Sequence, residues 1–176
     1  MRYPAEQAAA RHERIVKEAS RLFREKGFEN VTVGEVMKAA GLTHGAFYAH
    51  FASKEELQKA AVAYGQDESA RRARSYGPTK KGRREYADRY LNARHRDNPG
   101  GGCTMAALAP EVARSTPELK VAFEQGLEKI LTARGEDRKA AIFRTAALLG
   151  GVVLARAVQD RRLSEEILES VRERMG

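Results

Sequence analysis

The chain has 176 residues, of which 42% are hydrophobic and 32% charged, and these proportions exclude a disordered or fibrous protein. Its net charge of +8 favours an anionic partner such as nucleic acid, and its single cysteine, Cys103, excludes a disulfide scaffold. No cysteine and histidine spacing typical of zinc occurs, so we expect no metal and no cofactor. The longest uncharged apolar stretch, Ala146 to Ala155, is too short to span a bilayer, and the N-terminus lacks an apolar signal core. We therefore expect a cytoplasmic protein with no membrane partner.

Apolar residues recur at i, i+3 and i+4 along nearly the whole chain, which predicts an all-α fold of about nine helices. The first four expected helices lie at Ala8–Lys26, ended by Gly27; Thr32–Ala40, opened by a capping box of Thr32 and Glu35; His44–Phe51; and a longer helix opened by a second capping box, Ser53 to Glu56. Gly77, Pro78 and Gly82 interrupt the pattern and predict a loop in a strongly basic region.

Further helices are expected in the second half of the chain. They lie near Arg83–Arg94; at Cys103–Arg114, after the breaker cluster Asn98 to Gly102; from Pro117 to about Arg134, capped by Thr116; at Glu136–Gln159; and in a last helix capped by Ser164. The chain is expected to divide into residues 9–69 and 70–176.

The two short helices within residues 32–51 are joined by a tight turn at Gly41, which is the pattern of a helix-turn-helix. Phe47 and Phe51 share one face of the second helix and are expected to point inward, leaving a narrow face for a major groove. Of the outward residues, Tyr48 and His50 can donate to phosphates, and His44 can reach a base edge or a phosphate. Ala46 or Ala49 can touch a thymine methyl group, and Lys54 supplies a cation for the DNA backbone.

The stretch RIVKEASRLFREKGFENVTVGEVMKAAGLTHGAFYAHFASKEEL, from Arg14 to Leu57, resembles the DNA-binding domain of TetR/AcrR-type transcriptional regulators. The resemblance covers about a quarter of the chain and rests on matched positions at fixed spacing: Ile15, Ala19, Phe23, Gly27, Phe28, Thr32, Val36, Ala40, Gly41, Gly45, Phe47, Tyr48, Phe51, Lys54, Glu55 and Leu57. The phrases GGCTMAALAPEVARS and LLGGVVLARAVQD also look like segments of such C-terminal domains, with less specificity.

The resemblance implies a repressor that binds a pseudo-palindromic double-stranded DNA operator as a homodimer and is released by a small-molecule effector. Residues 9–69 would bind DNA, and residues 70–176 would bind the effector and a second subunit. The implied DNA contacts are Thr32, Thr43, His44, Gly45, Tyr48, Ala49, His50 and Lys54. Gly34 departs from family members that carry a long polar side chain there, so DNA shape is expected to contribute to specificity.

Two further sites are predicted in the C-terminal part. Apolar stripes with paired glycines predict a dimer interface at Ile142, Ala146, Leu149, Gly150, Val153, Leu168 and Val171. Helix order and apolarity suggest an effector pocket at Leu91, Cys103, Met105, Leu108, Phe123 and Leu127.

Other functions compete with this interpretation. An enzyme is not expected, because His95 and Cys103 form the only Cys–His candidate and a loop separates them. A helical interaction protein remains open, as does a thiol-based sensor in which Cys103, at the start of a helix, is the reactive group. The basic stretch Arg71 to Arg96 is interpreted as a solvated face, with contact to DNA or an acidic ligand as the alternative.

Overall fold

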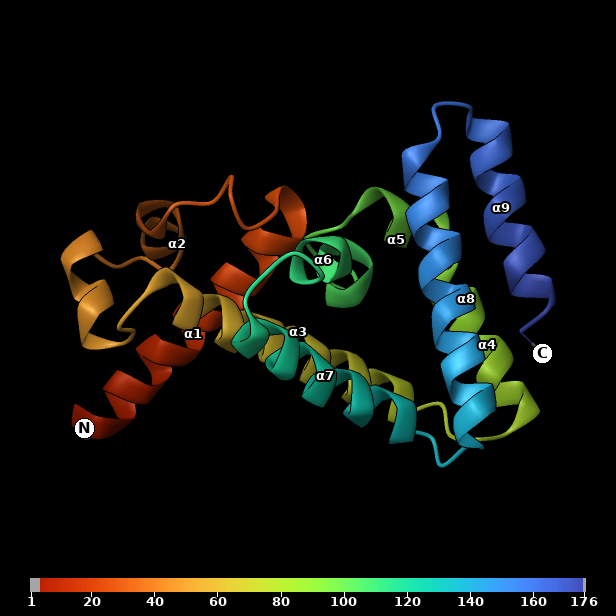
Figure 1. The fold of residues 1–176 in the computed structure, drawn as a ribbon, viewed down its shortest axis with the longest axis horizontal. Helices are drawn as coiled ribbons and strands as arrows, with labels where there is room; N and C mark the ends of the chain where they lie inside the picture. Colours follow the sequence, from red (N-terminus) through yellow and green to blue (C-terminus); the bar gives the residue numbers. More distant parts are fainter. Residues whose placement is uncertain (1–3, 176) are drawn as a thin grey trace.

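The computed structural model describes residues 4–175, in which all regular secondary structure is helical (Figure 1). In chain order the elements are α1 (Pro4–Lys26), α2 (Val33–Ala39), the 3-10 helix η1 (His44–Ala49), α3 (Lys54–Arg74), α4 (Lys80–Tyr90), α5 (Ala93–Asp97), α6 (Thr104–Val112), α7 (Pro117–Thr132), α8 (Arg138–Ala157) and α9 (Arg161–Glu173). The all-α prediction is confirmed for this part of the chain.

The N-terminal helices α1, α2 and η1 pack with the first half of α3 around one apolar core. Its largest fully buried side chains include Ile15, Phe23, Met37, Phe47 and Leu57. Helices α1 and α2 both end at a glycine with positive φ, +81° at Gly27 and +68° at Gly41, as the sequence predicts. These turns bring α2 and η1 back against α1 and fix the geometry of the helix-turn-helix.

Helix α3 connects this core to a second one. Its first half contributes Leu57, Ala61 and Val62 to the N-terminal core, and its second half contributes Ala70 and Ala73 to the C-terminal core. Helix α7 runs alongside α3 (Figure 1). The two helices can approach closely at Gly126 because it has no side chain, and a Cβ there would overlap the side chain of Gln66. The expected domain boundary at residues 69–70 therefore falls inside one continuous helix.

Helices α8 and α9 lie side by side at the end of the molecule opposite α2 (Figure 1). By length and composition α8 is apolar enough to cross a bilayer, a property that it shares with core helices of soluble proteins. It nevertheless carries Arg144, which pairs with the buried carboxylate of Glu136 at 3.0 Å.

Three sequence expectations about helices need correction. Ser164 does not cap the last helix: Asp160 does, and Ser164 lies buried inside α9, where its hydroxyl donates to the Ala155 carbonyl oxygen at 2.7 Å. The second motif helix, expected at His44–Phe51, is a 3-10 helix that ends at Ala49. The single helix expected near Arg83–Arg94 is two helices, because Leu91 leaves the helical region and Asn92 caps α5.

Candidate functional site

The exposed surface of η1 is held by two buried aromatic rings. Phe47 and Phe51 are 1% and 3% exposed, and their stacked rings lie 5.7 Å apart between centroids. Tyr48 points the other way and is 71% exposed, more than any other large hydrophobic side chain among the described residues. The remaining residues predicted to contact DNA here are also accessible, with Thr43, His44, Gly45 and Ala49 exposed and His50 half-buried. The structure thus separates an anchoring face from an outward face, as the sequence predicts.

The N-terminus of α2 is closed by the predicted capping box. The Glu35 N–H donates to the Thr32 hydroxyl at 3.2 Å, and the Thr32 N–H donates to the Glu35 carboxylate at 2.8 Å. The Thr32 N–H bond, with the Lys26 ammonium, lowers the pKa of Glu35. The exposed Thr32 is thereby fixed at the edge of the motif. His44 lies next to α2, since a Cβ on Gly34 would lie 3.4 Å from its Nδ1 atom.

Helix α1 adds residues beside the motif that sequence reasoning missed. The His12 ring stacks on Phe51 at 4.6 Å between centroids. Partial burial, with the nearby charges of His12 and Arg11, lowers the pKa of His50. Arg11 is therefore a further cation close to His50, at the end of η1. The sequence shows the polar face of α1, but only the packing of α1 on Phe51 reveals which part of that face lies beside η1.

Lys54 is the first residue of α3, the helix that follows η1. Ser53 caps this helix by accepting the Glu56 N–H at 3.1 Å, and Glu56 in turn accepts the Ala52 N–H at 2.7 Å. The cap fixes the start of α3, and with it the backbone position of the half-buried Lys54. The arrangement presents one cation and the Tyr48 hydroxyl from the same end of the molecule, which suits contacts to a phosphate backbone.

Known proteins share this domain. The family model described as bacterial regulatory proteins, tetR family, matches residues 15–61. The chain is therefore similar to this family over residues 15–61. The uncharacterized HTH-type transcriptional regulator YerO of Bacillus subtilis is 48% identical over 52 residues, which are 30% of this chain and 18% of YerO. The HTH-type transcriptional regulator AcrR of Shigella flexneri is 40% identical over 52 residues, 30% of this chain and 24% of AcrR. The matched segment thus spans about a quarter or less of these relatives.

Solved structures extend the similarity of fold to the whole chain. Reduced NemR of E. coli superposes with a TM-score of 0.79 at 20% identity, covering 94% of this chain and 95% of NemR. A TetR transcriptional regulator of Chloroflexus aurantiacus gives a TM-score of 0.73 at 24% identity, covering 96% of this chain and 95% of that protein. The C-terminal helices therefore adopt the arrangement found in TetR-family structures.

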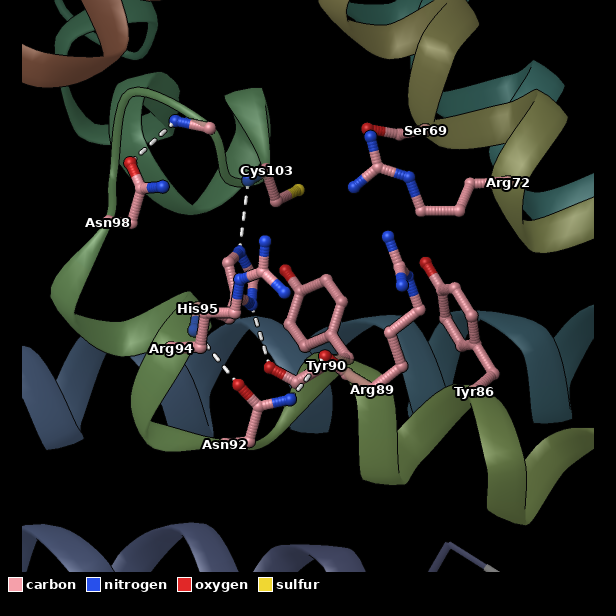
Figure 2. Close-up of a pocket in the computed structure, with 11 residues that line it drawn as sticks. Ser69, Arg72, Tyr86, Arg89, Tyr90, Asn92, Arg94, His95, Asn98 and Cys103 are labelled. Carbon is pink, nitrogen blue, oxygen red and sulfur yellow. Dashed lines mark hydrogen bonds between the residues drawn. The ribbon is translucent and has the colours of Figure 1, made fainter.

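The C-terminal part of the chain contains a cavity of about 510 Å³ between α3, α4, α5 and the loop before α6 (Figure 2). Its walls are formed by Ser69, Arg72, Tyr86, Arg89, Tyr90, Asn92, Arg94, His95, Asn98, Gly101 and Cys103. Of the residues expected to line an effector pocket, Cys103 lines this cavity, and both Cys103 and Met105 line a much smaller one behind it. Cys103 is 5% exposed.

The other expected pocket residues lie elsewhere. Leu91 and Leu108 are fully buried by packing, Leu108 in the N-terminal core and Leu91 in the C-terminal core. Phe123 packs against both cores, and Leu127 packs against the C-terminal one. None of these four lines either cavity. Apolar periodicity identified core positions here, whereas the cavity is lined mainly by polar side chains.

His95 organises the floor of the cavity. Its Nε2 accepts the Cys103 N–H at 3.0 Å, so the ring proton resides on Nδ1, which donates to the Tyr90 carbonyl oxygen at 2.7 Å (Figure 2). Burial lowers the pKa of His95, and the charges of Arg156, Arg72 and Arg89 act in the same direction. The imidazole is therefore neutral and ties α5 to the start of α6.

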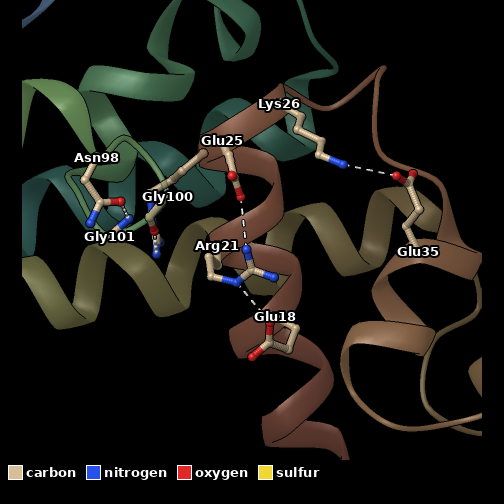
Figure 3. A network of polar contacts seen from close by, with 9 residues as sticks. Glu18, Arg21, Glu25, Lys26, Glu35, Asn98, Gly100 and Gly101 are labelled. Atoms are coloured by element: carbon tan, nitrogen blue, oxygen red, sulfur yellow. Dashed lines mark hydrogen bonds and ion pairs between the residues drawn. The ribbon is translucent and has the colours of Figure 1, made fainter.

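The loop beside the cavity is also joined to the DNA-binding domain. Gly100 packs on α1, since a Cβ there would lie 3.4 Å from Arg21 and 3.6 Å from Glu25 (Figure 3). Arg24 donates to the Gly100 carbonyl oxygen through Nη2 at 2.6 Å and through Nε at 2.9 Å. Asn98 of the same loop lines the cavity. One short segment therefore contacts both α1 and the space where a small molecule could bind.

The predicted dimer residues divide into two groups. On α8, Ile142, Ala146 and Val153 are exposed and Gly150 faces open space. Leu149 and Val171 are half-buried, and Leu168 is 4% exposed because α9 turns it toward the core. Leu168 is therefore not available to a partner, whereas Leu163 of α9, 43% exposed and absent from the predicted set, is accessible. No group of His, Cys, Asp and Glu suited to a metal ion occurs among residues 4–175.

Proposed function

We propose that the chain is a DNA-binding transcriptional regulator that represses transcription as a homodimer and releases DNA when a small molecule binds. The observation that carries the proposal is the outward face of η1 within the TetR-type domain, where Tyr48 is 71% exposed while Phe47 beside it is buried. A large exposed aromatic residue on an element anchored by its neighbours suits a contact surface. The chain acts by binding, in the cytoplasm, and not by catalysis.

The homodimer would form through α8 and α9. The stripe of Ile142, Ala146, Gly150 and Val153 recurs at helical spacing, and Gly150 permits a close approach of a second helix. A two-fold axis through this face would place two copies of η1 at separate positions along DNA. Their symmetry would require a pseudo-palindromic site with half-sites about one helical turn apart, or at a related spacing. Pairing with a second copy, rather than with lipid, would cover the apolar surface of α8.

The cavity between α3, α4, α5 and the loop before α6 suits the effector site. A ligand that favours one position of the loop at Gly100 over another would change the position of α1, and with it the separation of the two η1 elements. By linkage, an effector that weakens DNA binding must itself bind the DNA-bound protein less tightly. The amount of release is set by the ratio of these two affinities.

The test is selection of bound sequences from a random double-stranded DNA pool by the purified protein, followed by titration of the enriched sequence in salt. Enrichment of an inverted repeat that resists random competitor DNA is expected. Binding that falls equally on all sequences as salt rises would reflect charge alone and would overturn the proposal.

A further inference from the structure

The wall of the cavity of about 510 Å³ carries positively charged side chains and no negatively charged ones. Three arginines, Arg72, Arg89 and Arg94, contribute to its wall, and no aspartate or glutamate does. Elsewhere on this chain most arginines with close partners pair with carboxylates, as in Arg138 with Glu128 at 2.8 Å. Within residues 4–175, the guanidinium groups of the three cavity arginines form no ion pair. The cavity thus gathers positive charge without neutralising it.

The positions of two arginines point to a shared ligand. Arg72 reaches into the cavity from α3, and Arg89 reaches toward it from α4 on the opposite side (Figure 2). Like charges facing each other across a partly enclosed space repel, and an anion placed between them removes this repulsion. Guanidinium groups also match the planar, bidentate geometry of carboxylates and phosphates.

A buried hydroxyl strengthens the argument. Tyr90 lines the cavity and is 9% exposed. Its hydroxyl oxygen is almost fully enclosed and has no hydrogen-bond partner among the described residues. Such a group carries a desolvation cost unless a ligand accepts its proton in a hydrogen bond. Burial, with the neighbouring Cys103 and Tyr86, raises the pKa of Tyr90 well above its ordinary value, so this hydroxyl keeps its proton and can donate.

The aromatic rings at the cavity indicate what kind of ligand body would fit beside the anionic group. Tyr86 and Tyr90 project side by side from α4, with ring centroids 5.9 Å apart, and the His95 ring lies 4.5 Å from that of Tyr90. His95 is neutral, and its nitrogens are used by Tyr90 and Cys103, so it offers a ring surface rather than a charge. These surfaces suit a planar or apolar body attached to the anionic group.

We propose that this cavity binds a small organic anion, with its carboxylate or phosphate group between Arg72 and Arg89 and its body against Tyr86 and Tyr90. The inference rests on the proposed function in so far as the anion is the effector. The cavity volume lies in the range of small-molecule sites. Tyr90 donates a hydrogen bond to the ligand and so gains the partner that it lacks.

The experiment is isothermal titration calorimetry of the full chain, without DNA, with 1-naphthoate, cinnamate and 1-naphthyl phosphate and with the neutral amides 1-naphthamide and cinnamamide. Binding of an acid at least about 10-fold tighter than its amide is expected, since each charge-assisted hydrogen bond contributes to affinity. The carboxylates and the phosphate ester distinguish the two anionic groups. Equal binding of acids and amides, or no binding of any acid at millimolar concentration, would overturn the proposal.

Matched variants locate the site. Arg89→Met is expected to weaken binding by about 10-fold or more, whereas Arg84→Met, on the same helix outside the cavity, leaves it unchanged. Tyr90→Phe removes only the unpartnered hydroxyl, so it should preserve thermal stability while weakening the acid selectively. Equal effects of Arg89→Met and Arg84→Met would overturn the assignment. An anion that binds here but leaves affinity for the selected DNA unchanged would contradict its role as effector, while the anion site would stand.

Discussion

Arg24 of α1 donates two hydrogen bonds to the carbonyl oxygen of Gly100, from Nε at 2.9 Å and from Nη2 at 2.6 Å. The remaining nitrogen, Nη1, donates to the Ser20 hydroxyl at 2.6 Å and to the Thr104 hydroxyl at 3.3 Å. Gly65 of α3 lies directly beneath, where a Cβ would overlap the Thr104 hydroxyl. This cluster connects α1, α3 and the start of α6 through one side chain, so it joins the DNA-binding domain to the wall of the cavity.

Replacing Arg24 should therefore destabilise the protein more than replacing a neighbouring arginine. Arg24→Met leaves the buried Gly100 carbonyl and the buried Ser20 hydroxyl without this donor, and we expect a loss of about 1–3 kcal/mol in the free energy of unfolding. Arg21→Met removes only exposed ion pairs with Glu18 and Glu25, which are worth less than about 1 kcal/mol. Urea denaturation of both variants measures the difference, and equal losses would contradict the role assigned to Arg24.

Lys54 should contribute one phosphate contact. Lys54→Ala is expected to weaken binding to all DNA sequences alike and to reduce the slope of log K against log salt by about one. Lys80→Ala is the matched control, because Lys80 also begins a helix but lies on α4 beyond the motif. Fluorescence anisotropy across a salt series measures both. A slope unchanged by Lys54→Ala would remove this contact.

Tyr48 is expected to donate its hydroxyl to a phosphate, so Tyr48→Phe should lower DNA affinity by about 5- to 10-fold without changing stability. Tyr76→Phe, a half-buried tyrosine that packs on Tyr86 in the C-terminal core, serves as the control. Anisotropy and thermal denaturation separate affinity from folding. DNA binding by Tyr48→Phe at the wild-type level would contradict a phosphate contact through the hydroxyl.

The face of α8 can be tested by charge insertion. Val153 of α8 and Val121 of α7 are both exposed, at 38% and 51%, so arginine at either position is compatible with the folded protomer. Val153→Arg should shift the protein from dimer to monomer in sedimentation velocity, because two copies of the new charge would meet near the two-fold axis. Val121→Arg should leave the dimer intact. A dimer that persists in Val153→Arg would place the interface elsewhere.

His95 gives the protein a dependence on pH. Because burial holds its pKa in the folded state below the ordinary value of 6.5, the unfolded chain takes up a proton first as the pH falls. The contribution of neutral His95 to the free energy of unfolding is complete above about pH 6.5. It is lost progressively below that pH, because protonation of Nε2 breaks the hydrogen bond from the Cys103 N–H.

Urea denaturation at successive pH values checks this dependence. We expect His95→Gln to reduce the loss of stability on acidification, and His50→Gln to serve as the control for the second histidine whose pKa is lowered. The same acid dependence in wild type and His95→Gln would show that other groups govern it.

Local signals in the sequence predicted three helix caps correctly, whereas the long-range geometry of the C-terminal half was predicted poorly. The caps at Thr32, Ser53 and Thr116 depend on residues within four positions of each other, so the sequence alone reveals them. Ser164 matched the same local pattern, but it instead bonds the Ala155 carbonyl oxygen from within a helix, because α9 packs on α8 there. No local pattern contains that contact.

The cavity, too, could not be predicted from local patterns in the sequence. Arg72 and Arg89 come from different helices, and their charges resembled a solvated basic stretch until the fold placed them on opposite sides of one space. A search for apolar positions could not find this site, since it selects residues that fill a core, such as Leu91 and Leu108. The signal that remained visible was the excess of basic residues between residues 61 and 100.

Helix α3 runs unbroken from Lys54, which follows η1 in the chain, to Arg74, and its Arg72 lines the cavity. Its 21 residues make a rod about 31 Å long at 1.5 Å per residue. A tilt of about 5° at one end of such a rod moves the other end by about 3 Å, close to the rise of one DNA base pair. In the proposed homodimer, a lever of this length would convert a small adjustment of side chains into a change of register with the double helix, and two-fold symmetry would double the mismatch.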